Sequence, residues 1–156
     1  MLEIHNQDIF KIAHGHDEAI CITTNGICKK DGSAVMGKGI AKTADDYFHI
    51  SGKLGEYLTK YGNRAFDMGF YSAFGQDEHH VLTFPTKMDW RNDSNINLIV
   101  TSAEQIIRIC DARGINKCYL PPVGCANGHL NYEALVQPVL SNILDDRFIV
   151  IVGYGI

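Results

Sequence analysis

Short apolar segments alternate with amphipathic segments along this chain of 156 residues, and this alternation limits the possible folds more than any other feature. The clearest apolar segment, residues 18–24, is apolar at four consecutive positions, a pattern typical of a strand covered on both faces. Strands are predicted at residues 2–5, 18–24, 70–74, 79–84, 117–120 and 148–153.

Helices are predicted between these strands. Residues 94–113 carry apolar side chains at spacings of three and four, with Ser94 as the expected N-cap and Gly114 as the expected end. Further helices are predicted at residues 37–48, 53–61 and 131–145, the last kinked at Pro138. Strands and helices in alternation predict the α/β class, with a mixed, mainly parallel central sheet.

Composition limits the class of protein. The formal net charge of −4 and pI of about 5.9 argue against a global basic surface, so nucleic acid would have to be contacted locally. No apolar run approaches the roughly 20 residues of a membrane span, and the first residues do not resemble a secretory signal. We therefore expect one domain over residues 1–156, no membrane contact and a cytoplasmic location.

Cysteines and histidines give no metal signal. The five cysteines are widely spread, without a C-x-x-C pair, which favours a reducing compartment. The pairs His14/His16 and His79/His80 lack a Cys or carboxylate partner at ligand spacing, so no metal site is predicted.

Ligands of α/β sheets bind beyond the carboxyl ends of the strands, so the segments that follow strands are the most informative. Asn25 follows the strand at 18–24, although Asn25-Gly26 is also an ordinary turn dipeptide. Residues 32–41 form a glycine-rich loop that leads into a helix, an arrangement that favours phosphate. A Walker A loop is disfavoured because Gly39 stands where Ser or Thr would hold Mg²⁺.

Two more segments follow strands. Residues 121–130 form a second glycine loop, in which Gly124 and Gly128 allow close backbone approach and Asn127 or His129 could bind a ligand. Two such loops at neighbouring strand ends would suit a diphosphate. Lys87 follows the strand at 79–84, where its amine could act on a sugar carbon, unless it is simply a surface lysine.

Together these segments resemble the macro domain family of ADP-ribose-binding modules, over nearly the whole chain. Phe84-Pro85-Thr86-Lys87, Trp90-Arg91 and Gly124-Cys125 are most similar to the branch of the terminal ADP-ribose protein glycohydrolase and the DNA-ADP-ribose-removing antitoxins. The resemblance implies a single three-layer α/β/α sandwich, without a cofactor and expected to be a monomer.

The resemblance also assigns roles. It implies that Lys87 is catalytic at the distal ribose, that Asp8 contacts adenine and that Asn25 reaches the distal ribose. The implied ligand-binding residues are Asp8, Ile9, Asn25, Met36, Gly37, Lys38, Gly39, Ile40, Thr86, Gly124, Cys125, Ala126, Asn127, Gly128 and Tyr154.

The chain also departs from this branch. Gly128 stands where the protein glycohydrolase has an aspartate, whereas Asn127-Gly128 resembles the antitoxins. Residues 27–33 look like an extra hairpin or loop beside the distal ribose that could set substrate choice.

Three functions remain open from the sequence. The chain could be a hydrolase that removes ADP-ribose from a nucleobase or a protein carboxylate, a reader that only binds ADP-ribose, or a phosphatase acting on ADP-ribose 1″-phosphate with His129 as acid or base. Partners are therefore ADP-ribose or an ADP-ribosylated macromolecule, with nucleic acid contacted only through the modified base. A thiol enzyme built on Cys125 and His129 is rejected, because nothing orients the pair.

Overall fold

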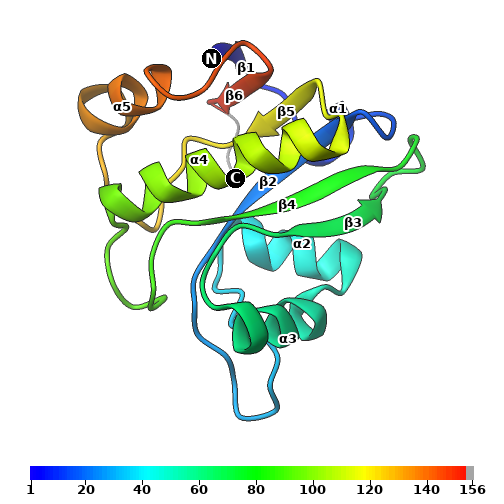
Figure 1. Cartoon of the computed structure of the whole chain (residues 1–156), viewed down its shortest axis with the longest axis vertical. Helices are drawn as coiled ribbons and strands as arrows, with labels where there is room; N and C mark the ends of the chain where they lie inside the picture. The colour runs from blue at the N-terminus through cyan, green and yellow to red at the C-terminus, as the bar shows by residue number, and fades with distance from the viewer. Residues whose placement is uncertain (154–156) are drawn as a thin grey trace.

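A computed structural model describes residues 1–153, which form a six-stranded sheet in the order β1-β6-β5-β2-β4-β3 (Figure 1). All neighbours are parallel except β3, which runs antiparallel to β4 at the edge. The strands are β1 (Leu2–His5), β2 (Glu18–Thr24), β3 (Asp67–Tyr71), β4 (His79–Pro85), β5 (Lys117–Leu120) and β6 (Phe148–Val152). The prediction of a mixed, mainly parallel sheet is confirmed.

Helices cover both faces of the sheet, which gives the expected three layers. They are α1 (Ile9–Ile12), α2 (Ile40–Phe48), α3 (Ser51–Tyr61), α4 (Ile96–Arg113) and α5 (Gln137–Ser141). Figure 1 shows α4 and α5 on one side of the sheet and α2 and α3 on the other. Each side has its own core: Ile20 and Ile22 of β2 pack with α1, α2 and α3, whereas Ala19 and Cys21 pack with α4 and α5. This division explains the consecutive apolar residues of β2.

Strand β3 was predicted three residues too late. It begins at Asp67, and its register with β4 shifts between Asp67 and Phe70. The expected end at Phe74 lies in a turn, where the Gln76 side chain accepts hydrogen bonds from the Ser72 hydroxyl and the Phe74 N–H. The aromatic residues that suggested a strand are partly exposed at the sheet edge, so they do not mark a buried strand.

Several predicted helix boundaries were also wrong. Helix α2 begins at Ile40 rather than at residue 37, and α3 begins at Ser51 rather than at residue 53. Helix α4 is capped by Asn95, whose side chain accepts from the N–H groups of Asn97 and Leu98, and Ser94 lies outside the helix. The helix ends at Gly114 as expected, with a φ of 67°. The helix predicted over 131–145 is a π-helical turn, Tyr132–Val136, followed by the short α5. Pro138 therefore sits in the first turn of α5, where a missing N–H costs nothing.

The segment predicted as an extra hairpin does form one, closed by an antiparallel bridge between Cys28 and Ala34. The Lys29 N–H donates to the Ser33 carbonyl at 2.7 Å. The hairpin rests on α3 at Gly55, where a Cβ would collide with the Gly32 carbonyl oxygen. Close glycine packing therefore fixes the position of this hairpin.

Within residues 1–153, no helix is both long and apolar enough to cross a membrane. The same residues contain no group of three or more His, Cys, Asp or Glu arranged to hold a metal ion.

Candidate functional site

A cavity of about 860 Å³ opens where β2, β4, β5 and β6 end. This volume is typical of small-molecule sites, and the position agrees with the rule for open α/β sheets. The residues of the candidate site that line it are Asn25, Met36, Gly37, Lys38, Gly39, Ile40, Thr86, Lys87, Gly124, Cys125, Ala126, Asn127 and Gly128. The structure thus brings together segments that are up to about a hundred residues apart in sequence.

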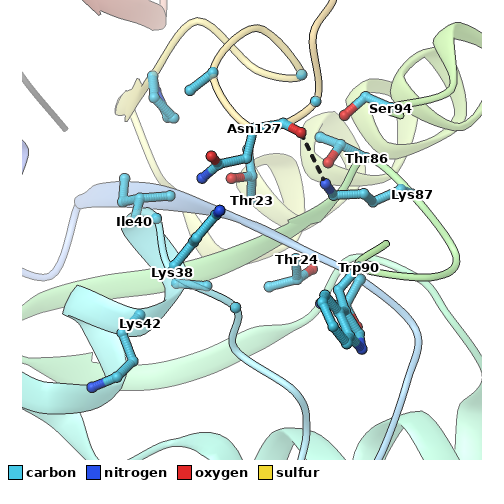
Figure 2. A pocket seen from close by; sticks show the side chains of 18 of the residues that line it. Thr23, Thr24, Lys38, Ile40, Lys42, Thr86, Lys87, Trp90, Ser94 and Asn127 are labelled. Carbon is cyan, nitrogen blue, oxygen red and sulfur yellow. Dashed lines mark hydrogen bonds between the residues drawn. The ribbon is translucent and has the colours of Figure 1, made fainter. Parts of the chain in front are cut away.

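The first glycine loop leads into the N-terminus of α2. Gly37 has a φ of 68°, a left-handed conformation that favours glycine, and Gly39 is the N-cap without a side-chain cap. The backbone N–H groups of the first helical turn therefore remain available to a ligand, at the positive end of the helix dipole. Figure 2 shows the Lys38 side chain on this loop reaching into the cavity.

The second glycine loop is packed against Ser94. The Ser94 N–H donates to the Gly128 carbonyl at 3.0 Å, and the Leu130 N–H donates to the Gly124 carbonyl at 2.9 Å. A Cβ at Gly128 would lie 2.5 Å from the Gly124 carbonyl oxygen and 2.8 Å from the Ser94 Cβ. Position 128 therefore has no room for a side chain unless the loop or Ser94 moves.

Lys87, which follows β4, lines the cavity. Its Nζ donates to the carbonyl oxygen of Asn92 at 3.2 Å and to that of Asn127 at 3.4 Å, and Figure 2 shows the bond to Asn127. The preceding residue, Thr86, is buried, and its N–H donates to the Thr24 carbonyl at 3.1 Å. The amine thus lies at the second glycine loop, on the wall of the cavity.

Asn63, which the sequence analysis did not identify, supports the Lys87 backbone. Its Nδ2 donates to the Lys87 carbonyl at 3.2 Å. The Gly26 N–H donates to the next carbonyl, that of Met88, at 2.7 Å. Asn63 lies in the loop between α3 and β3, and no motif marks it, so only the fold reveals this role.

Asn25 is buried and already makes two hydrogen bonds. Its Nδ2 donates to the Val35 carbonyl at 2.9 Å, and its Oδ1 accepts from the Ile27 N–H at 3.0 Å. One amide N–H and one lone pair remain for a ligand. Asn25 therefore ties β2 to the hairpin and also faces the cavity.

The cavity is positively charged although the protein is acidic. Lysines 29, 38, 42 and 87 line it, whereas Asp45 is its acidic lining residue among those described. The Asp45 carboxylate accepts from the Ser51 N–H at 2.9 Å, and Lys42 pairs with Asp46. Arg91 pairs with Asp89 outside the cavity and lowers the pKa of that carboxyl to about 2. This distribution suits an anionic ligand.

The residues considered for other chemistries are not arranged for it. Burial raises the pKa of the Cys125 thiol to about 11, and its Sγ contacts the Val123 carbonyl, so a thiolate is disfavoured at neutral pH. His129 pairs with Asp93 at 2.8 Å, with both side chains exposed and outside the cavity lining. These positions support the rejection of a thiol enzyme.

The structure does not place Asp8 and Ile9 on the cavity wall. Asp8 is the N-cap of α1 and accepts from the Phe10 N–H at 2.9 Å, and Ile9 is fully buried in the core. Tyr154 lies outside the described residues. The adenine contact of Asp8 and the ligand-binding roles of Ile9 and Tyr154 stay predictions.

Several cavity residues were not among the predicted ligand contacts. The rule that ligand sites follow strand ends could have identified the additional lining residues at the ends of β2, β5 and β6. Lys42 and Asp45 face the cavity only because of the orientation of α2. The additional residues are Thr23, Thr24, Lys29, Val35, Ala41, Lys42, Asp45, Trp90, Ser94, Pro121, Pro122, Ile151 and Gly153.

The chain is similar in sequence to two curated proteins named DNA ADP-ribosyl glycohydrolase, from Mycobacterium bovis and Mycobacterium tuberculosis. Each is 30% identical over 126 residues, which is 80% of this chain. The chain spans about a third of the length of these relatives, with 34% of each covered. No sequence-family model matches the chain.

Solved structures agree with this similarity. The macrodomain of Mycobacterium tuberculosis DarG is 25% identical, with a TM-score of 0.71 and 97% of each chain covered. The macrodomain of Thermus aquaticus DarG, at 21% identity, has a TM-score of 0.70 over 100% of this chain and 99% of its own. Thermosipho africanus DarTG in complex with ADP-ribose has a TM-score of 0.66 at 22% identity, over 85% of this chain and 37% of its own. In its sequence, its three-layer fold and its two glycine loops, the chain is similar to macro domains, including that of Mycobacterium tuberculosis DarG.

Proposed function

We propose that this protein binds ADP-ribose in the cavity and removes it, by hydrolysis, from a modified nucleobase of DNA. The observation that carries this proposal is the position of Lys87, whose amine is held at the second glycine loop inside a positively charged cavity. The names of the mycobacterial relatives, DNA ADP-ribosyl glycohydrolase, support a nucleobase rather than a protein carboxylate as the linked group.

The lining of the cavity suits the diphosphate and the distal ribose of the ligand, whereas the contacts of Asp8 and Tyr154 stay predictions. The diphosphate would lie between the N-terminus of α2 and the loop at 124–128, which together supply unpaired backbone N–H groups. The distal ribose would lie between Asn25 and Lys87, with its C1″ towards the Lys87 amine. Asp8 and Tyr154 would contact the adenine at the other end.

Lys87 would act at C1″, where positive charge develops as the glycosidic bond breaks. If Lys87 attacks, the Lys87–C1″ bond forms while the bond from C1″ to the base breaks, and the base keeps the electron pair and takes a proton. Water then replaces the amine at C1″ and releases ADP-ribose. If Lys87 does not attack, water adds to C1″ directly and Lys87 only positions the ligand through its polar contacts.

The test is hydrolysis of a single-stranded oligonucleotide that carries one ADP-ribosylated base. The wild-type protein should release ADP-ribose and the unmodified oligonucleotide, and Lys87→Ala should lose at least about 100-fold of the rate while still binding ADP-ribose. If Lys87 attacks, opening of the ribose ring in the Lys87–C1″ adduct gives an imine, and borohydride should then trap a protein–ADP-ribose adduct in the wild-type protein but not in Lys87→Ala. Equal rates for wild type and Lys87→Ala would contradict the proposal.

A reader that binds without hydrolysis is the second candidate, and one observation favours it. Asp45 is the carboxylate on the described cavity wall, and it is already hydrogen-bonded to the Ser51 N–H, so no free carboxylate there is placed to activate water. Tight ADP-ribose binding without turnover of ADP-ribosylated DNA or of an ADP-ribosylated glutamate peptide would establish the reader.

We further propose that the protein works as a monomer, without a cofactor, in the cytoplasm. All five cysteines lie within the described residues and carry free thiols, which fits a reducing compartment.

A further inference from the structure

We propose that Trp90 and Lys29 form a subsite for the group linked to ADP-ribose, in which the indole stacks on the modified base and the lysine contacts the flanking phosphate. This inference rests on the proposed function and adds to it the residues that select nucleic acid. Trp90 and Lys29 are separate from the two glycine loops and from Lys87.

Trp90 lies at the end of the cavity where the linked group must leave. It follows Lys87 by three residues, lines the same cavity and remains 49% exposed. Figure 2 shows the indole beyond Thr24 and Lys87, on the side away from α2. In the proposed pose the diphosphate and adenine lie in the opposite direction, so ADP-ribose itself does not need this ring.

The loop that carries Trp90 is held on both sides. Before the indole, the carbonyls of Lys87 and Met88 accept from the Asn63 side chain and the Gly26 N–H. After it, the Arg91 guanidinium pairs with Asp89 and lies 5.7 Å from the centre of the indole ring. The ring is therefore presented in a fixed place, which lowers the entropic cost of stacking a base on it.

Lys29 reaches the same cavity from the hairpin at residues 27–33. The hairpin is fixed by its bridge between Cys28 and Ala34 and by the close packing of Gly32 on Gly55. Lys29 is exposed and lines the cavity, whereas the adjacent Lys30 is exposed but does not line it. A positive charge thus lies at the rim of the cavity in a protein with a net charge of −4.

An indole and a lysine on the wall of the same cavity favour a nucleobase over a peptide carboxylate as the linked group. Single-strand binding sites combine aromatic rings, on which bases stack, with cations that contact the phosphates. A glutamate or aspartate side chain offers no flat surface to an indole. Aromatic stacking is also tolerant of sequence, so this subsite would accept the modified base in varied sequence contexts.

The chain offers a direct probe, because Trp90 is its only tryptophan. Intrinsic fluorescence should be quenched on titration with a single-stranded oligonucleotide ADP-ribosylated on one thymine. Free ADP-ribose and an ADP-ribosylated glutamate peptide should quench it much less. Lys87→Ala is used for the titrations, so that the ligand is not consumed. Equal quenching by all three ligands, or no quenching by the oligonucleotide, would overturn the inference.

Kinetics on the same oligonucleotide test the energetic role. Trp90→Ala should lower kcat/KM about 5- to 150-fold, mainly through KM, and Trp90→Phe should keep most of the activity because it keeps an aromatic face. Lys29→Ala should weaken the salt dependence of KM, and Lys30→Ala is the matched control that should behave as wild type. The dissociation constant for free ADP-ribose should stay within about twofold in both Trp90 variants and in Lys30→Ala.

The outcomes separate the two proposals. Wild-type protein that binds ADP-ribose but leaves every ADP-ribosylated substrate intact would refute the hydrolase, while the fluorescence titration would still decide the subsite. Conversely, full activity of Trp90→Ala on the oligonucleotide would overturn the subsite and leave the hydrolase intact. The subsite would also be overturned if Trp90→Ala lowered cleavage of the glutamate peptide to the same degree.

Discussion

Adding one methyl group at Gly128 should displace the second glycine loop. In Gly128→Ala, the new Cβ would lie 2.5 Å from the Gly124 carbonyl oxygen and 2.8 Å from the Ser94 Cβ. An ordinary contact begins at about 3.4 Å, so backbone on both sides of the loop would have to move by about 0.6–0.9 Å. Ser94 cannot simply turn away, because its own Cβ and the Gly124 backbone are part of the obstruction.

Overpacking of this kind costs about 1–3 kcal/mol of unfolding free energy. For a domain of this size each kcal/mol corresponds to roughly 2–4 °C, so Tm should fall by about 2–12 °C. The displaced loop carries Asn127, whose carbonyl accepts from the Lys87 amine, so ADP-ribose binding should weaken as well.

Differential scanning fluorimetry and calorimetric titration with ADP-ribose would measure both effects. Gly52→Ala is the matched control, because a Cβ there meets nothing and its φ is not in the left-handed region; its Tm should be unchanged or higher. Adding Ser94→Ala to Gly128→Ala should restore only part of the loss, since the Gly124 carbonyl stays in place. Wild-type stability and affinity in Gly128→Ala would refute the packing argument.

Three further predictions concern residues outside the glycine loops. Asn63→Ala should lower kcat by roughly 10- to 100-fold with little change in the dissociation constant for ADP-ribose, because the Lys87 carbonyl loses its hydrogen bond from Asn63. Timed product assays would measure kcat and calorimetry would measure the dissociation constant. An unchanged kcat would contradict the prediction. Gly55→Ala should cost about 1–3 kcal/mol in denaturant unfolding, because its Cβ collides with the Gly32 carbonyl oxygen of the hairpin; unchanged stability would mean that the hairpin does not rest on α3. Burial lowers the pKa of His79 below the usual 6.5, in surroundings that include His14, Glu18 and His80. Below about pH 6.5 the unfolded chain therefore binds a proton that the folded chain does not, and stability should fall as the pH falls from 6.5 towards the folded-state pKa. His79→Phe should reduce that fall in pH-dependent unfolding, and an identical pH profile would contradict the assignment.

The sequence was sufficient for the order of the strands and for half of the residues that line the cavity. Strands β2 and β5 were predicted to the residue, because each is a short apolar run with a clear boundary. The glycine loops and Lys87 were identified because ligand sites in α/β sheets follow strand ends, which is a local property of the chain.

The features that the sequence missed depend on tertiary contacts. Ser94 has a side chain typical of an N-cap, yet its N–H donates to the Gly128 carbonyl in the second glycine loop. Asn95 caps the helix instead. Strand β3 is an edge strand with an irregular register, so its apolar pattern is weak. Asn63 supports Lys87 across the fold, and no local pattern encodes such a contact.

Calorimetric titration of the wild-type protein with ADP-ribose tests the central claim most directly. The account predicts one-to-one binding that is weakened by Gly128→Ala and kept by Lys87→Ala. No heat and no competition at millimolar ADP-ribose would contradict it, because the two glycine loops and the positive cavity would then serve another ligand.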